Sequence, residues 1–438
     1  MGHVILGAFC TGLLLCIIFD ISIIYALIAG LLLFMLYGRR RGFSWRELMS
    51  MALRGVRTVR NILITFFLIG IMTALWRVAG TVPFIVCHAT KLIRPSVFLL
   101  MAFLLNSGLS FLTGTSFGTA ATMGMICAAM GAAMNVDPIL TGGAVLSGAF
   151  FGDRCSPVST SALLVAAVTE TDIYGNIRRM LRSALVPFAA TCLIYFGLGA
   201  LLPHEGAAME LEALFSRSFR LDPVTILPAA AVLLLALLRV DVKLAMGASI
   251  LTAIPICLFV QHSSFADILR ASVYGFSPKD AEVAALINGG GIASMLKVAC
   301  IVCISSAYSD IFNKTGLLDG AKHAISAFSR KTNRFAAILL SAIVSGMIAC
   351  NQTLTILLSD QLCRDLYTDR GRLALDLEDT AVVIAPLIPW SIAGAVPLAT
   401  VGAPAAAVLA SFYLILIPVY RLIAATMGKA GNGGEDAR

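Results

Sequence analysis

The sequence predicts an all-α membrane protein that crosses the bilayer many times and contains about ten to twelve membrane-embedded elements. Of its 438 residues, 59% are hydrophobic and only 13% are charged, whereas soluble domains carry about a quarter charged residues. Apolar runs long enough to cross a hydrocarbon layer of about 30 Å recur along the whole length. A single soluble core is therefore excluded, and the lipid bilayer is the expected surrounding of most of the chain.

The first 60 residues predict two retained helices followed by a cytoplasmic segment. Residues 4–19 and 21–37 are apolar and show no convincing small-residue cleavage site, so no signal peptide is expected. Residues 39–60 contain seven arginines against one acid, Glu47. Such an excess of basic residues is typical of cytoplasmic loops, and binding of anionic lipids is an alternative role.

Further apolar segments follow, separated by short polar connections. They cover residues 62–78, 97–112, 120–134, 139–151, 184–202, 224–238, 244–260, 292–308, 335–348, 381–398 and 405–423. We divide the chain into N-terminal helices with the basic segment (1–60), a first repeat (61–202), connecting helices (203–290), a second repeat (291–428) and a disordered tail (429–438).

The charge and the cysteines exclude several classes of partner. The net charge of +8 comes from residues in short connections, as in cytoplasmic loops, so no nucleic-acid partner is expected. Most of the eleven cysteines lie within apolar segments, where a thiol behaves as a small hydrophobe. Cys300 and Cys303 lack a second pair with the spacing of a metal site. No cofactor is therefore expected.

A weak internal similarity indicates that the two predicted repeats are related. At an offset of 236 residues, the region of Gly114 aligns with the polar stretch 350–353. The order of polar breaks recurs, although few residues are identical. Residues 263–282 correspond to the basic segment 39–60 but have no basic excess. This contrast favours opposite membrane sides and hence an inverted repeat.

The first candidate site is a break rich in glycine and hydroxyl residues between two apolar segments. An unwound membrane segment frees backbone carbonyls that lipid cannot satisfy, so it must face protein or a water-filled cavity. Carbonyl and hydroxyl oxygens can there replace the hydration shell of a cation. A helix-packing seam of small residues is the alternative. The candidate ligands of this break are Thr113, Gly114, Thr115, Ser116, Gly118 and Thr119.

A second break places an acid and a base, Asp153 and Arg154, between apolar residues. Charges at membrane depth are costly, and they usually pair, line a pathway or relay protons. Asp153 is the leading candidate for coupling, because one carboxylate can exchange a proton for a cation. An ordinary loop at the membrane surface is the alternative. The further candidate ligands are Ser156, Pro157, Ser159 and Thr160.

The second half offers comparable groups. Its polar stretch contains amide and hydroxyl side chains that could hold a cation or an organic solute. Glu378 and Asp379 then precede an apolar run that contains three prolines, which favours a discontinuous or re-entrant element. These two acids are candidate proton sites, or alternatively the stabilised first turn of a helix. The candidate ligands of the polar stretch are Asn351, Gln352, Thr353 and Thr355.

Together these breaks predict a secondary transporter rather than an enzyme or a scaffold. A Na⁺ site is expected at Thr115, Ser116, Asp153 and Ser156, with Na⁺ and H⁺ as coupling ions and no cofactor. A hydrolase that uses Asp153, Ser156 and His88 is disfavoured, because the five histidines are scattered and form no HExxH pair. A non-transporting scaffold would leave two corresponding polar breaks without a purpose.

At these same residues the chain resembles the NhaC-type family of Na⁺/H⁺ antiporters, within the broader ion transporter superfamily. The resemblance covers residues 61–182 and 345–405. It implies a secondary transporter with inverted repeats and alternating access, a homodimer, and a place in a bacterial or archaeal cell membrane. The matching stretches are Ile69-Gly70-Ile71-Met72, Trp76, Gly80-Thr81-Val82-Pro83, residues 114–119, 147–154, Ser156-Pro157, Ser159, Leu377-Glu378-Asp379 and Pro386-Leu387-Ile388-Pro389-Trp390.

Two departures from the family pattern concern the ion chemistry. After Ser156-Pro157 that pattern reads Leu-Ser-Asp-Thr-Thr-Asn, whereas residues 158–163 here lack the second acid and the asparagine. Phe117 also stands where the family has tryptophan. The alternative that the protein moves a small organic acid or amino acid, coupled to Na⁺ or H⁺, therefore stays open.

Overall fold

The chain folds into an all-helical bundle, described in a computed structural model for residues 2–19, 21–92, 94–201, 208–238, 240–315 and 332–431. Within these ranges there is no strand, only one isolated bridge between Phe276 and Gly289. The predicted all-α class is therefore confirmed. Residues 432–438 of the predicted tail lie outside the described ranges.

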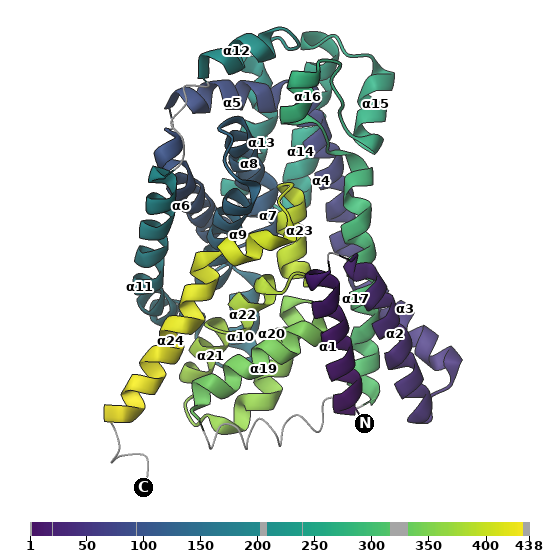
Figure 1. The fold of residues 1–438 in the computed structure, drawn as a ribbon, viewed down its shortest axis with the longest axis vertical. Helices are drawn as coiled ribbons and strands as arrows, with labels where there is room; N and C mark the ends of the chain where they lie inside the picture. The colour runs from purple at the N-terminus through teal and green to yellow at the C-terminus, as the bar shows by residue number, and fades with distance from the viewer. Residues whose placement is uncertain are drawn as a thin grey trace.

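The elements follow one another as helices joined by short turns (Figure 1). In chain order they are α1 (Gly2–Ile18), α2 (Ile23–Arg40), α3 (Trp45–Thr58), α4 (Arg60–Val78), α5 (Thr81–Leu92), α6 (Pro95–Thr113), α7 (Ser116–Thr119), the π-helix η1 (Ala120–Gly124), α8 (Met125–Ala133), α9 (Pro138–Cys155), α10 (Thr160–Thr169), α11 (Ile173–Ala200), α12 (Ala208–Ser216), η2 (Pro223–Ile226), α13 (Leu227–Leu237), α14 (Val242–Pro255), η3 (Ile256–Val260), α15 (Phe265–Tyr274), α16 (Ala281–Ile287), α17 (Gly291–Thr315), α19 (Arg334–Ala349), α20 (Gln352–Cys363), η4 (Arg364–Leu366), α21 (Arg370–Glu378), α22 (Ala381–Ile384), η5 (Ala385–Leu387), α23 (Ile392–Thr400), η6 (Ala405–Ala410) and α24 (Phe412–Gly431).

Seven helices of the described chain are long and apolar enough to cross a membrane, or eight if a bent pair counts as one span. The bent pair joins 370–387 to α23 at an angle of 55°. Three shorter apolar helices, at 223–237, 334–349 and 412–427, accompany them. The prediction of about ten to twelve membrane-embedded elements included short and broken helices of this kind. The number of helices that can cross the membrane is therefore smaller than the number of elements. The protein is a multi-pass membrane protein.

The basic N-terminal segment forms the amphipathic helix α3, which begins with a capping box. The Ser44 hydroxyl accepts a hydrogen bond of 3.2 Å from the Glu47 amide, and the Glu47 carboxylate accepts one of 2.7 Å from the Ser44 amide. Such reciprocal bonds satisfy amides that a helix start leaves free. Gly55 then lets α3 approach α17 closely, since a Cβ there would lie 2.1 Å from the Ser306 carbonyl oxygen.

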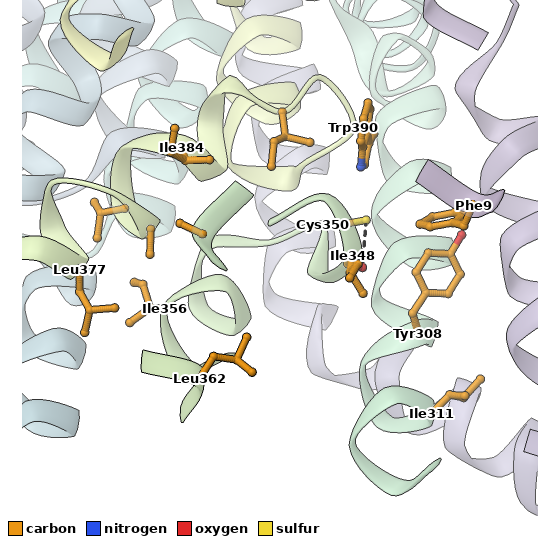
Figure 2. Packing of buried hydrophobic residues seen from close by; sticks show 14 of the residues in the cluster. Phe9, Tyr308, Ile311, Ile348, Cys350, Ile356, Leu362, Leu377, Ile384 and Trp390 are labelled. Carbon is orange, nitrogen blue, oxygen red and sulfur yellow. Dashed lines mark hydrogen bonds between the residues drawn. The ribbon is translucent and has the colours of Figure 1, made fainter. Parts of the chain in front are cut away.

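One large apolar cluster fixes the second half against the N-terminal helices (Figure 2). Phe9 packs edge-to-face against Tyr308, with ring centroids 5.6 Å apart. In the same cluster Trp390 donates a hydrogen bond of 3.0 Å to the Met347 carbonyl. This packing holds the end of α19 against the segment before α23, where two of the helix breaks lie.

Glycines bring α6 and α9 into backbone contact. A Cβ at Gly152 would lie 2.1 Å from the Ser110 carbonyl carbon, and one at Gly148 would lie 2.6 Å from the Phe103 carbonyl oxygen. The alternative of a small-residue packing seam therefore applies to these two helices. Their close approach places the end of α9, which carries Asp153 and Arg154, beside the end of α6.

Candidate functional site

The predicted break at Gly114 is present and is only two residues long. The preceding helix α6 ends at Thr113, and Gly114 adopts the left-handed conformation with φ 67°. Thr115 is extended and caps α7, because its hydroxyl accepts a hydrogen bond of 3.2 Å from the Gly118 amide. The chain then continues through the π-helix into α8. The break thus separates two apolar helical segments, 95–113 and 116–133, each long enough to cross a membrane.

The second predicted break lies directly against the first. After α9 ends at Cys155, Ser156 is extended and Ser159 caps α10. A Cβ at Gly114 would lie 2.7 Å from the Val158 carbonyl carbon. The absence of a side chain at Gly114 therefore lets the two breaks touch.

The second half repeats this local geometry at the offset found in the sequence. After α19, Cys350 is left-handed with φ 57°, and Asn351 is extended and caps α20 by accepting a hydrogen bond of 2.9 Å from the Leu354 amide. A further break before α23 lies against this one, because the Ile392 amide donates a bond of 2.8 Å to the Cys350 carbonyl. Each half thus pairs a left-handed break with the capped start of another helix.

Asp153 joins the two halves. Its side chain is 3% exposed, and one carboxylate oxygen accepts a hydrogen bond of 2.9 Å from the Gln352 amide at the start of α20. The other oxygen accepts a longer bond of 3.3 Å from the Ser159 hydroxyl. The alternative of an ordinary surface loop is therefore wrong. Two residues that are 199 positions apart in sequence, Asp153 and Gln352, meet inside the bundle.

Glu378 is a buried acid without a hydrogen-bond partner. Its side chain is 1% exposed, and both carboxylate oxygens lack a donor within the described part of the chain. Asp153, Arg154 and Asp379 are near enough to interact with it electrostatically. An ionised carboxylate in such a place is costly unless a proton or a cation neutralises it.

The interpretation of Glu378 and Asp379 as the first turn of a helix is wrong. Glu378 is the last residue of α21, and Asp379 follows it in the turn before α22. The C-terminal end of a helix carries partial negative charge, so the dipole does not stabilise acids there. Their burial must be compensated by other side chains.

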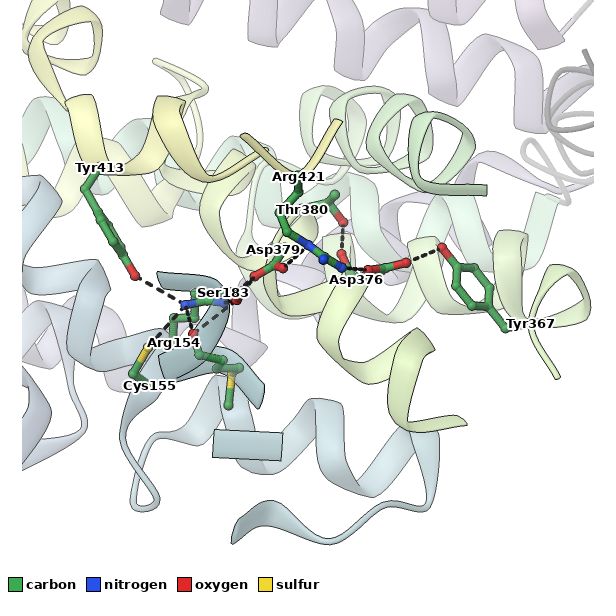
Figure 3. Close-up of polar contacts among 10 residues, drawn as sticks. Arg154, Cys155, Ser183, Tyr367, Asp376, Asp379, Thr380, Tyr413 and Arg421 are labelled. Atoms are coloured by element: carbon green, nitrogen blue, oxygen red, sulfur yellow. Dashed lines mark hydrogen bonds and ion pairs between the residues drawn. The ribbon is translucent and has the colours of Figure 1, made fainter. Parts of the chain in front are cut away.

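A chain of buried ion pairs compensates Asp379 (Figure 3). Arg154 and Asp379 form an ion pair with both side chains fully buried. Arg421 of α24 lies 2.7 Å from the other carboxylate oxygen of Asp379 and 2.5 Å from Asp376. Tyr367 completes the series by donating a hydrogen bond of 2.8 Å to Asp376.

Arg154 is held by further contacts on α11 and α24. Its guanidinium donates hydrogen bonds of 2.7 Å to the Ser183 hydroxyl, 3.2 Å to the Met180 carbonyl and 3.3 Å to the Tyr413 hydroxyl. This guanidinium is therefore a fixed internal charge. It is directed toward Asp379 (Figure 3).

Several members of this network were not predicted from the sequence, namely Ser161, Ser183, Tyr367, Asp376, Tyr413 and Arg421. Only Arg421 carries the signal that identified Asp153, because it is a charge within the apolar run 405–423, whereas Asp376 lies in the polar helix α21. The hydroxyl residues carry no such signal. Ser161 donates a hydrogen bond of 2.8 Å to the Asp153 carbonyl.

Other predicted ligands face different surroundings. Thr113, Thr115 and Gly118 line a cavity of ≈ 250 Å³ whose remaining wall is mostly apolar and comes from α13, α14, the residue Val240 between them, Thr122 and Val158. Thr160 and Thr353 are exposed. The hydroxyls of Thr119 and Thr355 donate to the carbonyls of Thr115 and Asn351.

The expected Na⁺ set is only partly assembled. Ser116 and Ser156 are buried and Thr115 is half-buried. Among the described contacts, none of the three hydrogen-bonds to Asp153, whereas Ser159 does. No cluster of three or more His, Cys, Asp or Glu side chains that could hold a metal ion occurs in the ranges searched. A cation at this place would therefore need hydroxyl and backbone carbonyl oxygens as ligands in addition to a carboxylate.

The hydrolase reading gains no support from the geometry. Residues 114–118 have the GxSxG spacing of a nucleophile elbow, but they follow helix α6 and run into α7, whereas the elbow follows a strand. The His88 ring stacks on Phe84 and contacts the Phe84 carbonyl at 2.9 Å. Asp153 is instead engaged by Gln352.

Comparison with known proteins gives a consistent result over nearly the whole chain. The model of the Na⁺/H⁺ antiporter family matches residues 1–169 and 148–429. The chain is 28% identical to the Na⁺/H⁺ antiporter NhaC of Alkalihalophilus pseudofirmus, over 94% of this chain and 91% of that protein. It is 27% identical to the malate-2H⁺/Na⁺-lactate antiporter of Bacillus subtilis, over 89% and 86%. It is 26% identical to the arginine/ornithine antiporter ArcD of Halobacterium salinarum, over 89% and 83%.

Proposed function

Because the chain belongs to the Na⁺/H⁺ antiporter family, we propose that it exchanges Na⁺ for H⁺ by alternating access at Asp153 and Glu378. The observation that carries this proposal is the state of Glu378, a buried acid whose two carboxylate oxygens have no described hydrogen-bond donor. Such a group binds either a proton or a cation, since neither lipid nor apolar side chains can stabilise its charge.

The charges of the site support this exchange. Four carboxyl groups, Asp153, Asp376, Glu378 and Asp379, share the buried region with two guanidinium groups, those of Arg154 and Arg421. The guanidinium groups pair with Asp376 and Asp379. Within the described part of the chain, neither Asp153 nor Glu378 forms an ion pair, although Arg154 is near Glu378. Two buried acids without an ion pair of their own can bind positive charge as a proton or as a cation.

The helix breaks supply the remaining oxygens. Carbonyl oxygens and hydroxyls at interrupted helices can complete the coordination of a hard cation. Ser159 contacts Asp153, and the breaks of both halves lie near it. Among the described contacts, Thr115, Ser116 and Ser156 form no hydrogen bond with Asp153 in this arrangement of the helix breaks. We propose that they contact the cation in another state of the transport cycle, after the breaks have rearranged.

The experiment is to measure proton movement in proteoliposomes that contain the purified protein. Addition of Na⁺ outside should change the internal pH, as reported by a trapped dye, and an ionophore that collapses the pH gradient should abolish the signal. Choline chloride at equal ionic strength is the control for osmotic effects. If neither Na⁺ nor Li⁺ changes the internal pH at any pH tested in sealed vesicles, the proposal is wrong.

A second candidate function is exchange of a small organic acid or amino acid. Two relatives are named for malate and lactate and for arginine and ornithine, and residues 158–163 lack the acid and asparagine of the antiporter pattern. A thermal-shift screen of organic acids and amino acids, with and without Na⁺, separates the candidates. If Na⁺ alone stabilises the protein and no solute does, the organic-solute function loses its support.

The architecture of the transporter is also proposed to be an inverted repeat that assembles as a homodimer. The matching breaks at Gly114 and Cys350 support the repeat, and the family resemblance implies the dimer. Accessibility of cysteines introduced at residues 43 and 277 to an impermeant reagent tests whether the two segments lie on opposite membrane sides. Light scattering with detergent correction gives the number of subunits.

A further inference from the structure

A third guanidinium group, half-buried, lies away from the proposed transport site. Arg77, near the end of α4, lines a cavity of ≈ 210 Å³ formed where α4, α5, α8, α16 and α23 approach one another. The cavity is lined by Thr73, Trp76, Arg77, Val82, Met125, Ala128, Ala129, Ala132, Ile287, Asn288, Thr400, Val401 and Gly402. None of these residues belongs to the predicted or observed site around Asp153.

Arg77 has no carboxylate partner in the described ranges. One terminal nitrogen donates a hydrogen bond of 2.8 Å to the Thr73 carbonyl, whereas Nε is buried and has no partner. An arginine that merely reached for the membrane surface would place its head group in water. Here the guanidinium instead stays half-buried at the cavity wall. A guanidinium without a counterion in such a place attracts an anion.

The other polar groups of the cavity favour the same kind of ligand. The hydroxyls of Thr73 and Thr400 donate to helix carbonyls at 2.9 and 2.8 Å, and the Trp76 indole donates to Ser249 at 2.8 Å. These donors are used within the protein. Among the described residues of the cavity, the remaining donors are the Arg77 N–H groups that do not bond to Thr73 and the amide of Asn288, which is exposed.

From these observations we propose that the Arg77 cavity binds a small organic carboxylate. A planar guanidinium matches a carboxylate with two parallel hydrogen bonds, and the apolar wall from α8 suits a short carbon chain. The cavity has room for about seven waters at about 30 Å³ each, which suits an acid of a few carbon atoms. This inference rests on the cavity and not on the ion exchanged at Asp153.

The position of the cavity connects it with the transport machinery. α8 continues from the Gly114 break, and α23 begins at the break whose Ile392 amide bonds to Cys350. One face of α8, from Met125 to Ala132, and the end of α23 at Thr400 form walls of the cavity. A carboxylate held there would contact one helix from each half, and it would favour the arrangement that keeps α8 and the end of α23 together.

Binding is tested on the full-length protein in detergent with sodium-free salts of L-lactate, L-malate and inorganic phosphate as probes. Isothermal titration measures affinity, and Trp76 in the cavity wall offers a fluorescence change as a second readout. Arg77→Gln should weaken lactate or malate binding by about tenfold or more, because a charge-assisted bond is lost. Arg77→Lys keeps the positive charge but cannot form the two parallel hydrogen bonds of a guanidinium, so it should weaken binding less than Arg77→Gln does.

Arg270→Gln is the matched control, since Arg270 is an exposed arginine that lines a different and larger cavity of ≈ 780 Å³. It should leave binding unchanged. The proposal is overturned if no carboxylate binds, if only phosphate binds, or if Arg77→Gln and Arg77→Lys bind as the unaltered protein does. Loss of binding with Arg270→Gln instead would move the site to the larger cavity. If Arg77→Gln loses carboxylate binding but keeps Na⁺-dependent proton flux, then the Arg77 cavity and the transport site at Asp153 are independent. Each proposal can then be refuted without the other.

Discussion

The Gln352 amide donates a hydrogen bond of 2.9 Å to the Asp153 carboxylate, and this contact joins the helix breaks of the two halves. The same nitrogen lies 3.2 Å from the Val382 carbonyl. One side chain at the start of α20 thus positions the leading acid of the site and contacts the helix that follows Asp379. From this contact we expect Gln352 to affect both stability and transport.

Replacement of Gln352 by alanine should impair transport more than stability. Loss of the buried donor should cost about 1–3 kcal/mol and weaken apparent Na⁺ affinity, because Asp153 loses its fixed orientation. Gln261→Ala is the matched control, since Gln261 also donates to two carbonyls, at 3.2 and 2.9 Å, away from the site. Thermal unfolding and proton flux are measured for both. Equal loss of flux in the two variants would refute the special role of Gln352.

Arg154 should be more important for folding than any surface arginine. Arg154→Gln leaves Asp379 buried without one of its two cations, and breaking such a pair costs about 3–5 kcal/mol. Arg217→Gln, which breaks the exposed pair with Glu282, should cost about 1 kcal/mol or less. Thermal unfolding in detergent compares the two variants. A smaller loss for Arg154→Gln than for Arg217→Gln would contradict the assignment of Arg154 as a fixed internal charge.

Gly114 should not tolerate a side chain. Alanine there would adopt φ 67° and place its Cβ 2.7 Å from the Val158 carbonyl carbon, so strain of about 1–3 kcal/mol is expected. Gly108→Ala is the control on the same helix, because no heavy atom lies within 4 Å of a Cβ there. That variant should be neutral or stabilised. Equal unfolding temperatures for the two variants would show that the breaks do not touch.

The stability of the amphipathic helix α3 should depend on pH through its capping box. The Ser44 amide, together with the Ser44 hydroxyl, holds the pKa of Glu47 below its ordinary value of 4.5. Because the pKa is lowered in the folded state, the capping box stabilises α3 above about pH 4.5 and is lost as the pH falls further. Hydrogen exchange at the start of α3 should therefore accelerate in acid. Glu47→Gln should remove this dependence, and acceleration that persists in this variant would assign it to another group.

The sequence predicted the locations of the helix breaks better than their chemistry. Gly114, Asp153 and Asn351 lie at interruptions because glycine, embedded charge and capping side chains have local signatures. The pairing of Asp153 with Gln352 depends on how the two halves pack, and no local pattern carries that information. The interpretation of Glu378 as part of the first turn of a helix was wrong for the same reason, since two adjacent acids do not show whether a helix begins or ends there.

The ion-pair chain illustrates the same limit. Arg154 was apparent as a charge at membrane depth, but its partner Asp379 is 225 residues away. Arg421 stands out as a charge in the last apolar run, but a single base near the end of a span also resembles an interfacial residue, so its role was not evident. The roles of Ser183 and Tyr413 follow only from the position of Arg154 in three dimensions.

Proton release on Na⁺ binding is the most direct test of exchange at Asp153 and Glu378. Purified protein in weakly buffered detergent solution is mixed with NaCl, and a pH dye reports the protons released. The unaltered protein and Glu170→Gln, in which an exposed acid is replaced, should release protons with saturating dependence on Na⁺. Glu378→Gln and Asp153→Asn should release fewer protons or none. Full release from both of these variants would contradict the central claim.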